Sequence, residues 1–317
     1  MNVKNTLRDI LAWSLALPAL PFLRFAAPRR ANLHTVRGLL DRIGVTVVHN
    51  HYYEPVFTTE DLIRDPEAPR ALAGIDWNTP GQLALLDQFR YAEDLRGLEG
   101  RSLAGRTFHY QNTMFGPGDA EALYSMIRVL KPSRIIEIGS GQSTLVARFA
   151  IEDATHEDPT YRCRHVCFEP FENPWLDSLG IDVRRERIER VDLSTFRDLQ
   201  PNDIVFIDSS HVMRPMGDVE FEYLHILPIL PVGVVVHVHD VFSPRDYPRE
   251  WLERDRRFWT EQYLLEAFLS FNDRFEIICS LNDLMHRHPD ALAKCFPVLA
   301  ERGALITVGS FWFRRTG

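Results

Sequence analysis

Two groups of polar residues stand where apolar runs end, and their types could do chemistry. The first is the sequence DSSH, from Asp208 to His211, which follows the run DIVFI. The second closes the run GVVVHVHD and contributes His237, His239 and Asp240. A histidine near neutral pKa can take a proton from a hydroxyl group, and histidines with carboxylates can also bind a metal ion. A general base, a structural hydrogen bond and metal ligation are therefore all open for His211.

A third pattern, RIIEIGSGQSTLVARFA at residues 134–150, joins an apolar run to an amphipathic one through a glycine turn. Glu137 precedes Gly139, Ser140 and Gly141, and the following helix would offer free backbone N–H groups at its start. A dinucleotide site favours a third glycine where this chain has Thr144. The acid before the turn also suits a cationic amino-acid ligand better than a pyrophosphate.

These polar groups can act together only if the fold brings them to the same edge of a sheet. From about Arg106, short apolar runs alternate with helical patterns, which predicts a parallel sheet with crossover helices. The predicted strands are Arg134–Ile138, His165–Glu169, Ile204–Asp208, Val232–His239, Arg274–Ser280 and Ala304–Phe313, the last two as an antiparallel closing pair. Ligands of such sheets bind outside the carboxyl ends of the strands, where the polar residues stand.

The ordered motifs resemble the class I S-adenosylmethionine (SAM) methyltransferases, in particular the bacterial methyltransferase-24-like group, over about residues 106–317. The resemblance implies an α/β fold: a Rossmann-like, seven-stranded, mostly parallel sheet with helices on both faces. It implies that Glu137, Gly139, Ser140 and Gly141 lie under the methionine part of SAM. It also implies that Glu169 binds the ribose and that Asp208 lies beside the transferable methyl group. As open alternatives, Glu169 could cap a helix and Asp208 could form a turn.

For catalysis we expect Asp208, His211 and Asp240 to orient or deprotonate the acceptor. In the catechol-type relatives a magnesium ion is held by an acid and an Asp-Asn pair, but here the pair is Asp240-Val241. That site is therefore not carried over intact. A Mg²⁺ or Mn²⁺ ion on Asp208 and Asp240, with His239 or His211, stays a second hypothesis.

Four further residues are predicted to contact the substrate: Tyr110, His239, Arg245 and Tyr247. Tyr110 precedes the first helix of the sheet domain, and the other three stand at or just after the strand predicted at Val232–His239. Loops after strand ends collect binding groups in open α/β sheets. Packing on the sheet is the alternative for the segment after Asp240, and the spacing from Phe258 to Phe271 predicts a core helix.

The composition of the chain limits which kinds of binding partner are expected. The chain has 317 residues and a formal net charge of −8, which argues against a sequence-independent nucleic-acid binder and favours a small-molecule or glycan acceptor. The four cysteines form no CxxC pair and are predicted to be reduced. The sequence gives no oligomeric state.

The first 105 residues are predicted to form a helical N-terminal extension, with the sheet domain over 106–317. Residues 10–23 carry no charge and lie between basic residues, but the run is short for a spanning helix and contains Pro18 and Pro21. A helix packed on the domain and an interfacial membrane anchor both fit. We therefore expect a cytoplasmic protein with peripheral contact at the inner membrane as an option.

Together these features predict a SAM-dependent methyltransferase acting on a hydroxyl oxygen of a small molecule, sugar or glycan. Oxygen is favoured because the chain has no Asn-Pro-Pro-aromatic tetrapeptide. A non-catalytic cofactor-binding or assembly module with the same fold is the main alternative, and a nicotinamide-dependent oxidoreductase is a further one.

Overall fold

The computed structural model describes residues 17–18, 20–26, 34–48, 51, 53–171, 173–302 and 307–317. Their contacts divide the chain into two units, Met1–Ile63 and Arg64–Gly317. The sequence-based boundary at residues 105/106 differs from this division and stays a prediction. No described helix is both long and apolar enough to cross a membrane.

The first unit is made of short helices. Its described elements are α2 (Leu20–Ala26), α3 (His34–Arg42) and η2 (Thr59–Asp61). The greater part of the apolar run 10–23 lies outside the described residues, and its last four residues begin α2.

The second unit is built on a seven-stranded sheet with the order β5-β4-β3-β6-β7-β9-β8. Its strands are β3 (Arg134–Ile138), β4 (Arg164–Phe168), β5 (Asp182–Arg184), β6 (Ile204–Ile207), β7 (Val235–Val238), β8 (Phe275–Ser280) and β9 (Phe311–Arg315). The first five pair in parallel, whereas β9 is antiparallel to both β7 and β8. The predicted Rossmann-like fold, including its antiparallel closing pair, is confirmed.

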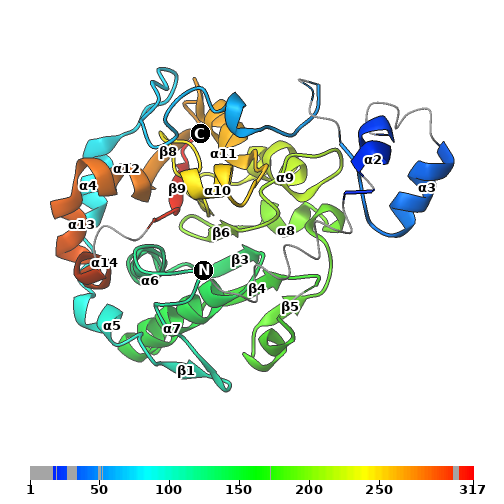
Figure 1. Cartoon of the computed structure of the whole chain (residues 1–317). Helices are drawn as coiled ribbons and strands as arrows, with labels where there is room; N and C mark the ends of the chain where they lie inside the picture. The colour runs from blue at the N-terminus through cyan, green and yellow to red at the C-terminus, as the bar shows by residue number, and fades with distance from the viewer. Residues whose placement is uncertain are drawn as a thin grey trace, which may run out of the picture. The chain divides into compact units, whose positions relative to one another are not determined.

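Helices cover both faces of this sheet (Figure 1). One face packs against α4 (Thr79–Leu86), α5 (Ala92–Arg96), α6 (Asp119–Leu130), α7 (Gln142–Glu157), α12 (Leu281–Arg287), α13 (Pro289–Cys295) and α14 (Pro297–Arg302). The other packs against α8 (Ser194–Arg197), α9 (Asp218–Phe221), η5 (Glu222–Ile226) and α11 (Glu261–Leu269). The remaining elements are the hairpin β1 (Ser102–Leu103) and β2 (Arg106–Thr107), η3 (Pro174–Ser178), η4 (Ile188–Arg190), η6 (Leu227–Ile229) and α10 (Arg249–Glu253).

Strand β6 shows why the sheet is buried on both sides. Ile204 and Phe206 belong to the core on one face, and Val205 and Ile207 to the core on the other. Side chains alternate along a strand, so a continuous apolar run fills two cores at once.

The strand order reverses between β3 and β6. From β3 the chain passes through α7 to β4 on one side, while β6 continues the sheet on the other. This is a topological switch point, and in open α/β sheets it opens a crevice beyond the carboxyl ends of the two strands. The glycine turn follows β3 and Asp208 follows β6, so both predicted groups stand there.

Candidate functional site

The glycine turn after β3 is shaped by its contact with the neighbouring strand. Gly139 has φ +78°, and a Cβ at this position would lie 1.9 Å from the carbonyl oxygen of Asp208. No other residue fits there without moving the backbone of β6. Gly141 follows as the N-terminal cap of α7. The predicted cofactor turn and the predicted catalytic acid are therefore in direct backbone contact.

Glu137 is buried beneath this turn, and both of its carboxylate oxygens are engaged. Oε1 accepts from Ser143 Oγ at 2.6 Å, and Oε2 accepts from Thr144 Oγ1 at 3.0 Å. Oε2 also lies 2.9 Å from His165 Nε2 and 3.2 Å from Cys167 Sγ. We call these five residues the closed network. It ties β3, β4 and the start of α7 together, so Glu137 supports the turn from below, and its direct contact with a cofactor stays a prediction.

Glu169 lies directly after β4, beside the turn. Its carboxylate accepts backbone N–H groups from Ser140 at 3.3 Å and from Phe171 at 3.1 Å. Asn173 Nδ2 donates to the Ser140 carbonyl at 2.8 Å and holds the same loop. Each carboxylate oxygen has more than one acceptor position, so Glu169 can also accept hydroxyl donors from a ligand over the turn. The sequence-predicted cofactor residues are thus brought together.

His211 joins the ends of β6 and β7. It adopts φ +60°, which turns the chain back after β6. Its Nε2 lies 3.3 Å from Asp208 Oδ1 and 3.6 Å from Asp240 Oδ2. The ligand atoms of these three residues all lie within 4.8 Å of one another, a spacing that a single cation could bridge.

His239 also lies near the Asp208 and Asp240 carboxylates. Its Nδ1 is 3.5 Å from Asp208 Oδ1 and 3.7 Å from Asp240 Oδ1, and its Nε2 is 3.6 Å from Asp119 Oδ2. We call Asp208, His211, His239 and Asp240 the open cluster, because these separations exceed ordinary hydrogen bonds. His237, two positions earlier, instead forms a hydrogen bond with Ser310 Oγ, at 3.0 Å, and packs between Phe206 and Trp312.

The ionisable groups of the open cluster have pKa values that are shifted in different directions. Burial opposes ionisation, but His239 and His211 hold the pKa of Asp208 well below its usual range. Burial raises the pKa of Asp240. Burial also disfavours the protonated imidazoles, yet Asp208 with Glu261 raises the pKa of His211, and Asp240 with Asp208 raises that of His239. The neighbouring carboxylates therefore favour the protonated form of His211.

Glu261 at the start of α11 is a site residue that the sequence analysis did not single out. Its Oε2 lies 2.8 Å from His211 Nδ1, and its backbone N–H donates to the His211 carbonyl at 3.2 Å. The ring of Trp259 lies against the imidazole, with centroids 4.3 Å apart. These contacts fix the ring so that Nε2 faces Asp208 and Asp240. No local pattern links Glu261 to a histidine 50 positions earlier.

Two more buried acids extend this polar region. Asp119, the first residue of α6, accepts the backbone N–H groups of Gly309 and Ser310 while it faces His239. Glu222 accepts from Ser209 Oγ at 3.1 Å, and burial together with Glu261 raises its pKa well above its usual range. The Ser209 and Ser210 hydroxyls are thus committed to acids of α9 and η5, since Ser210 Oγ donates to Asp218.

Two of the predicted substrate residues, Tyr110 and Tyr247, use their hydroxyl groups in hydrogen bonds within the protein. Tyr110 is buried and donates its hydroxyl to the Leu95 carbonyl at 2.9 Å. Tyr247 is buried, and its hydroxyl accepts the Gln262 N–H at 3.1 Å. Arg245 is half-buried, and burial lowers its pKa. Only His239 among the four lies in the open cluster, so substrate contact by the other three stays a prediction.

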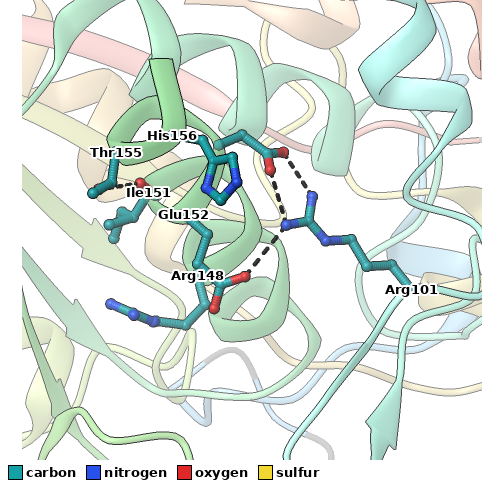
Figure 2. A pocket seen from close by; sticks show the side chains of 7 residues that line it. Arg101, Arg148, Ile151, Glu152, Thr155 and His156 are labelled. Carbon is teal, nitrogen blue, oxygen red and sulfur yellow. Dashed lines mark hydrogen bonds and ion pairs between the residues drawn. The ribbon is translucent and has the colours of Figure 1, made fainter. Parts of the chain in front are cut away.

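A separate pocket of about 480 Å³ lies along α7 (Figure 2). Its lining includes Arg101, Arg148, Glu152, Asp153 and His156. Arg101 is paired with Asp153 at 2.6 Å and with Glu152 at 3.3 Å, while Arg148 points away from it. Helix α7 begins at the glycine turn, and the α7 residues that line this pocket lie in its later turns. The pocket is therefore separate from the open cluster, which stands at the carboxyl ends of the strands.

Residues 136–241, which hold the glycine turn, Glu169 and the open cluster, match the family model described as a methyltransferase domain. This segment is a methyltransferase domain. The resemblance inferred from the motifs is confirmed by the match, which runs from β3 to just past β7.

Two known proteins are remotely similar to this chain. An uncharacterized protein of Archaeoglobus fulgidus is 27% identical over 175 residues, which cover 51% of this chain and 77% of that protein. An O-methyltransferase of Bacillus cereus, solved in complex with SAH, is 13% identical with a TM-score of 0.34, covering 74% of this chain and 91% of that one. The family match, and not these likenesses, identifies the methyltransferase domain.

Proposed function

We propose that this protein is a SAM-dependent methyltransferase that methylates a hydroxyl oxygen of a small molecule, sugar or glycan. The observation that carries the proposal is the backbone contact between Gly139 and Asp208. It sets a turn suited to the cofactor against a cluster suited to proton transfer. Methyl transfer needs both within one small volume, because the reacting atoms must meet in line.

In this proposal the cofactor lies over the turn. The ribose hydroxyls donate to the Glu169 carboxylate, and the amino-acid part lies over Gly139 and Gly141. The closed network keeps the turn rigid from beneath, with Glu137 as its common acceptor. Neither glycine carries a side chain that would hold the ligand away from the backbone.

The reaction is a direct displacement. The acceptor oxygen attacks the methyl carbon, the carbon–sulfur bond breaks, and its electron pair stays on sulfur as S-adenosylhomocysteine leaves. The hydroxyl proton passes to the open cluster. Asp208 and Glu261 raise the pKa of His211, and the positive charge of the sulfonium would lower it and free Nε2 to accept that proton. Glu261 would keep the ring in position during the transfer.

A divalent cation is a narrower proposal for the same cluster. Asp208, Asp240 and the imidazole of His211 or His239 could hold Mn²⁺, which accepts mixed oxygen and nitrogen ligands more readily than Mg²⁺ does. Such an ion would polarise the acceptor hydroxyl. Retention of full activity after chelation with EDTA would remove this part of the proposal and leave the rest intact.

The proposed function is tested by calorimetric titration with SAM and, separately, with NAD. We expect micromolar binding of SAM, no binding of NAD, and roughly tenfold weaker SAM binding by Glu169→Gln, which loses charge-assisted hydrogen bonds. The matched control is Glu67→Gln, because Glu67 is exposed and distant in sequence from Glu169. This variant should bind SAM normally. Binding of NAD alone would favour an oxidoreductase, and binding of neither ligand would contradict the proposed function.

A further inference from the structure

The charge of the chain is concentrated with opposite signs in its two parts. Residues 1–42 carry seven basic and two acidic residues, whereas the remaining 275 residues carry 29 basic and 42 acidic ones. The N-terminal segment is therefore strongly cationic on an otherwise acidic protein. A cationic segment is attracted to anionic surfaces within about a Debye length.

The helices of this segment expose apolar side chains between their basic residues. Leu20, Phe22 and Phe25 of α2 are about half exposed, at 48%, 48% and 52%. Arg24 stands between the two phenylalanines and is also exposed. Aromatic and basic side chains mixed on a short helix are typical of an element that lies in the headgroup region of a membrane.

The second helix repeats this combination. Leu39 of α3 is 62% exposed, and Ile43, four positions later and just past the helix end, is 66% exposed. Residues four apart lie on the same side of a helix, so these two side chains form one apolar stripe. The exposed Arg42 ends α3 next to it.

These apolar side chains do not serve a core in the described part of the first unit. Among the residues of 1–63 whose side chains the structure describes, none is buried, whereas the second unit has extensive cores on both faces of its sheet. Nine of the seventeen exposed large apolar side chains of the described residues lie in the first unit. Large apolar side chains left in water mark an interaction surface.

We propose that α2 and α3 dock this protein on the surface of an anionic lipid membrane. Leu20, Phe22, Phe25, Leu39 and Ile43 would enter the headgroup region, and the arginines would pair with lipid phosphates. A second copy of the segment is a poorer occupant, because it would bring seven basic residues against seven. The helix α2, with 7 residues, is far shorter than a membrane-spanning helix, so the contact is interfacial.

The test is vesicle flotation of the full chain, with phosphatidylcholine vesicles and with vesicles of equal parts phosphatidylcholine and phosphatidylglycerol. We expect binding to the anionic vesicles only, and less of it in high salt. Phe22→Ser/Phe25→Ser should weaken binding by about tenfold or more, because it removes two inserting aromatic side chains. Arg24→Glu/Arg42→Glu should weaken it by at least about fivefold for each arginine.

Matched controls come from the second unit. Leu224→Ser/Phe271→Ser removes two apolar side chains that are more exposed than Phe22 and Phe25, at 54% and 91%, and Arg190→Glu/Arg197→Glu reverses two exposed arginines. Both controls should float like the unsubstituted protein. Absence of flotation with anionic vesicles, or equal losses in the control variants, would overturn the proposal. So would a dimer, seen in sedimentation, that Phe22→Ser/Phe25→Ser dissociates without changing flotation. The proposal is independent of cofactor binding, which calorimetry measures separately.

Discussion

The closed network and the open cluster contain similar residues but differ in how tightly those residues are joined. Around Glu137, the four contacts with Ser143, Thr144, His165 and Cys167 measure 2.6–3.2 Å. Around Asp208 and Asp240, the contacts with His211 and His239 measure 3.3–3.7 Å. Both groups have the residue types that bind metals or move protons. Only the second leaves acceptor and donor capacity for a substrate, so we assign structure to the first and chemistry to the second.

The largest effect is expected where the two groups meet. Gly139→Ala places a Cβ 1.9 Å from the Asp208 carbonyl oxygen, so it should lower the free energy of unfolding by about 4 kcal/mol or more and abolish SAM binding. Urea unfolding and calorimetry measure the two effects. Gly105→Ala is the matched control, because Gly105 has φ +76° with nothing within 4 Å. It should cost only about 1–2 kcal/mol of backbone strain. Equal losses in both variants would contradict the clash.

His211→Asn should separate chemistry from cofactor binding. We expect methyl transfer to fall by about 100-fold to 10,000-fold, because the proton acceptor is lost. Cofactor affinity should change little, since His211 contacts Asp208, Asp240 and Glu261 and not the glycine turn. The measurement is single-turnover transfer to an acceptor found by screening. His165→Asn in the closed network is the control, and a folded sample of it should retain near-normal turnover. A reversal of these two outcomes would reverse our assignment.

Glu137→Gln should have a moderate effect, and on stability. The amide nitrogen cannot accept hydrogen bonds, so Ser143 or Thr144 loses its acceptor, and we expect a loss of about 2–3 kcal/mol in urea unfolding. Asp240→Asn is the matched change in the open cluster. Asp240 has φ +56°, a conformation that asparagine tolerates well. The free energy of unfolding of Asp240→Asn should therefore fall by less than about 1 kcal/mol. Similar losses in the two variants would show that the closed network is not tighter.

The smallest effect concerns Glu121, which is buried in α6. It accepts backbone N–H groups from Gly118, Val298 and Leu299, and burial raises its pKa from 4.5 to about 7. A raised pKa contributes stability that is complete below the unfolded value and is lost as the pH rises through the folded one. The free energy of unfolding should therefore fall by about 2 kcal/mol between pH 4.5 and 7 through this residue.

Glu121→Gln should remove that part of the pH dependence while keeping the acceptor oxygen. Urea unfolding at several pH values compares the slopes of the two proteins. An unchanged slope would mean that the backbone donors stabilise the carboxylate enough to cancel its burial.

The sequence predicted the strands that carry the site because each is a continuous apolar run closed by polar residues. Strand β3 has the predicted bounds, β4 begins and ends one residue earlier than predicted, and β6 ends one residue earlier. The edge strand β5, Asp182–Arg184, was missed because three half-buried residues make no apolar run. Strand β9 begins at Phe311, later than the predicted 304, because apolar composition does not mark where pairing with β7 starts.

Within the site, the sequence predicted residues that end strands and missed those that arrive from elsewhere. Asp208, His211 and Asp240 follow β6 and β7 directly, so strand order alone brings them together. Glu261 and Asp119 begin helices whose positions depend on tertiary packing. Tyr110 and Tyr247 show the converse limit, since residue type could not reveal that their hydroxyls bond within the core.

The most direct test of the central assignment is a crystal structure of this protein with S-adenosylhomocysteine. We predict that the ribose hydroxyls bond to Glu169, that the amino-acid part lies over Gly139 and Gly141, and that sulfur faces Asp208 and His211. The side chains of the closed network should not move. A ligand bound in the pocket along α7, or one whose sulfur lies away from the open cluster, would contradict the account.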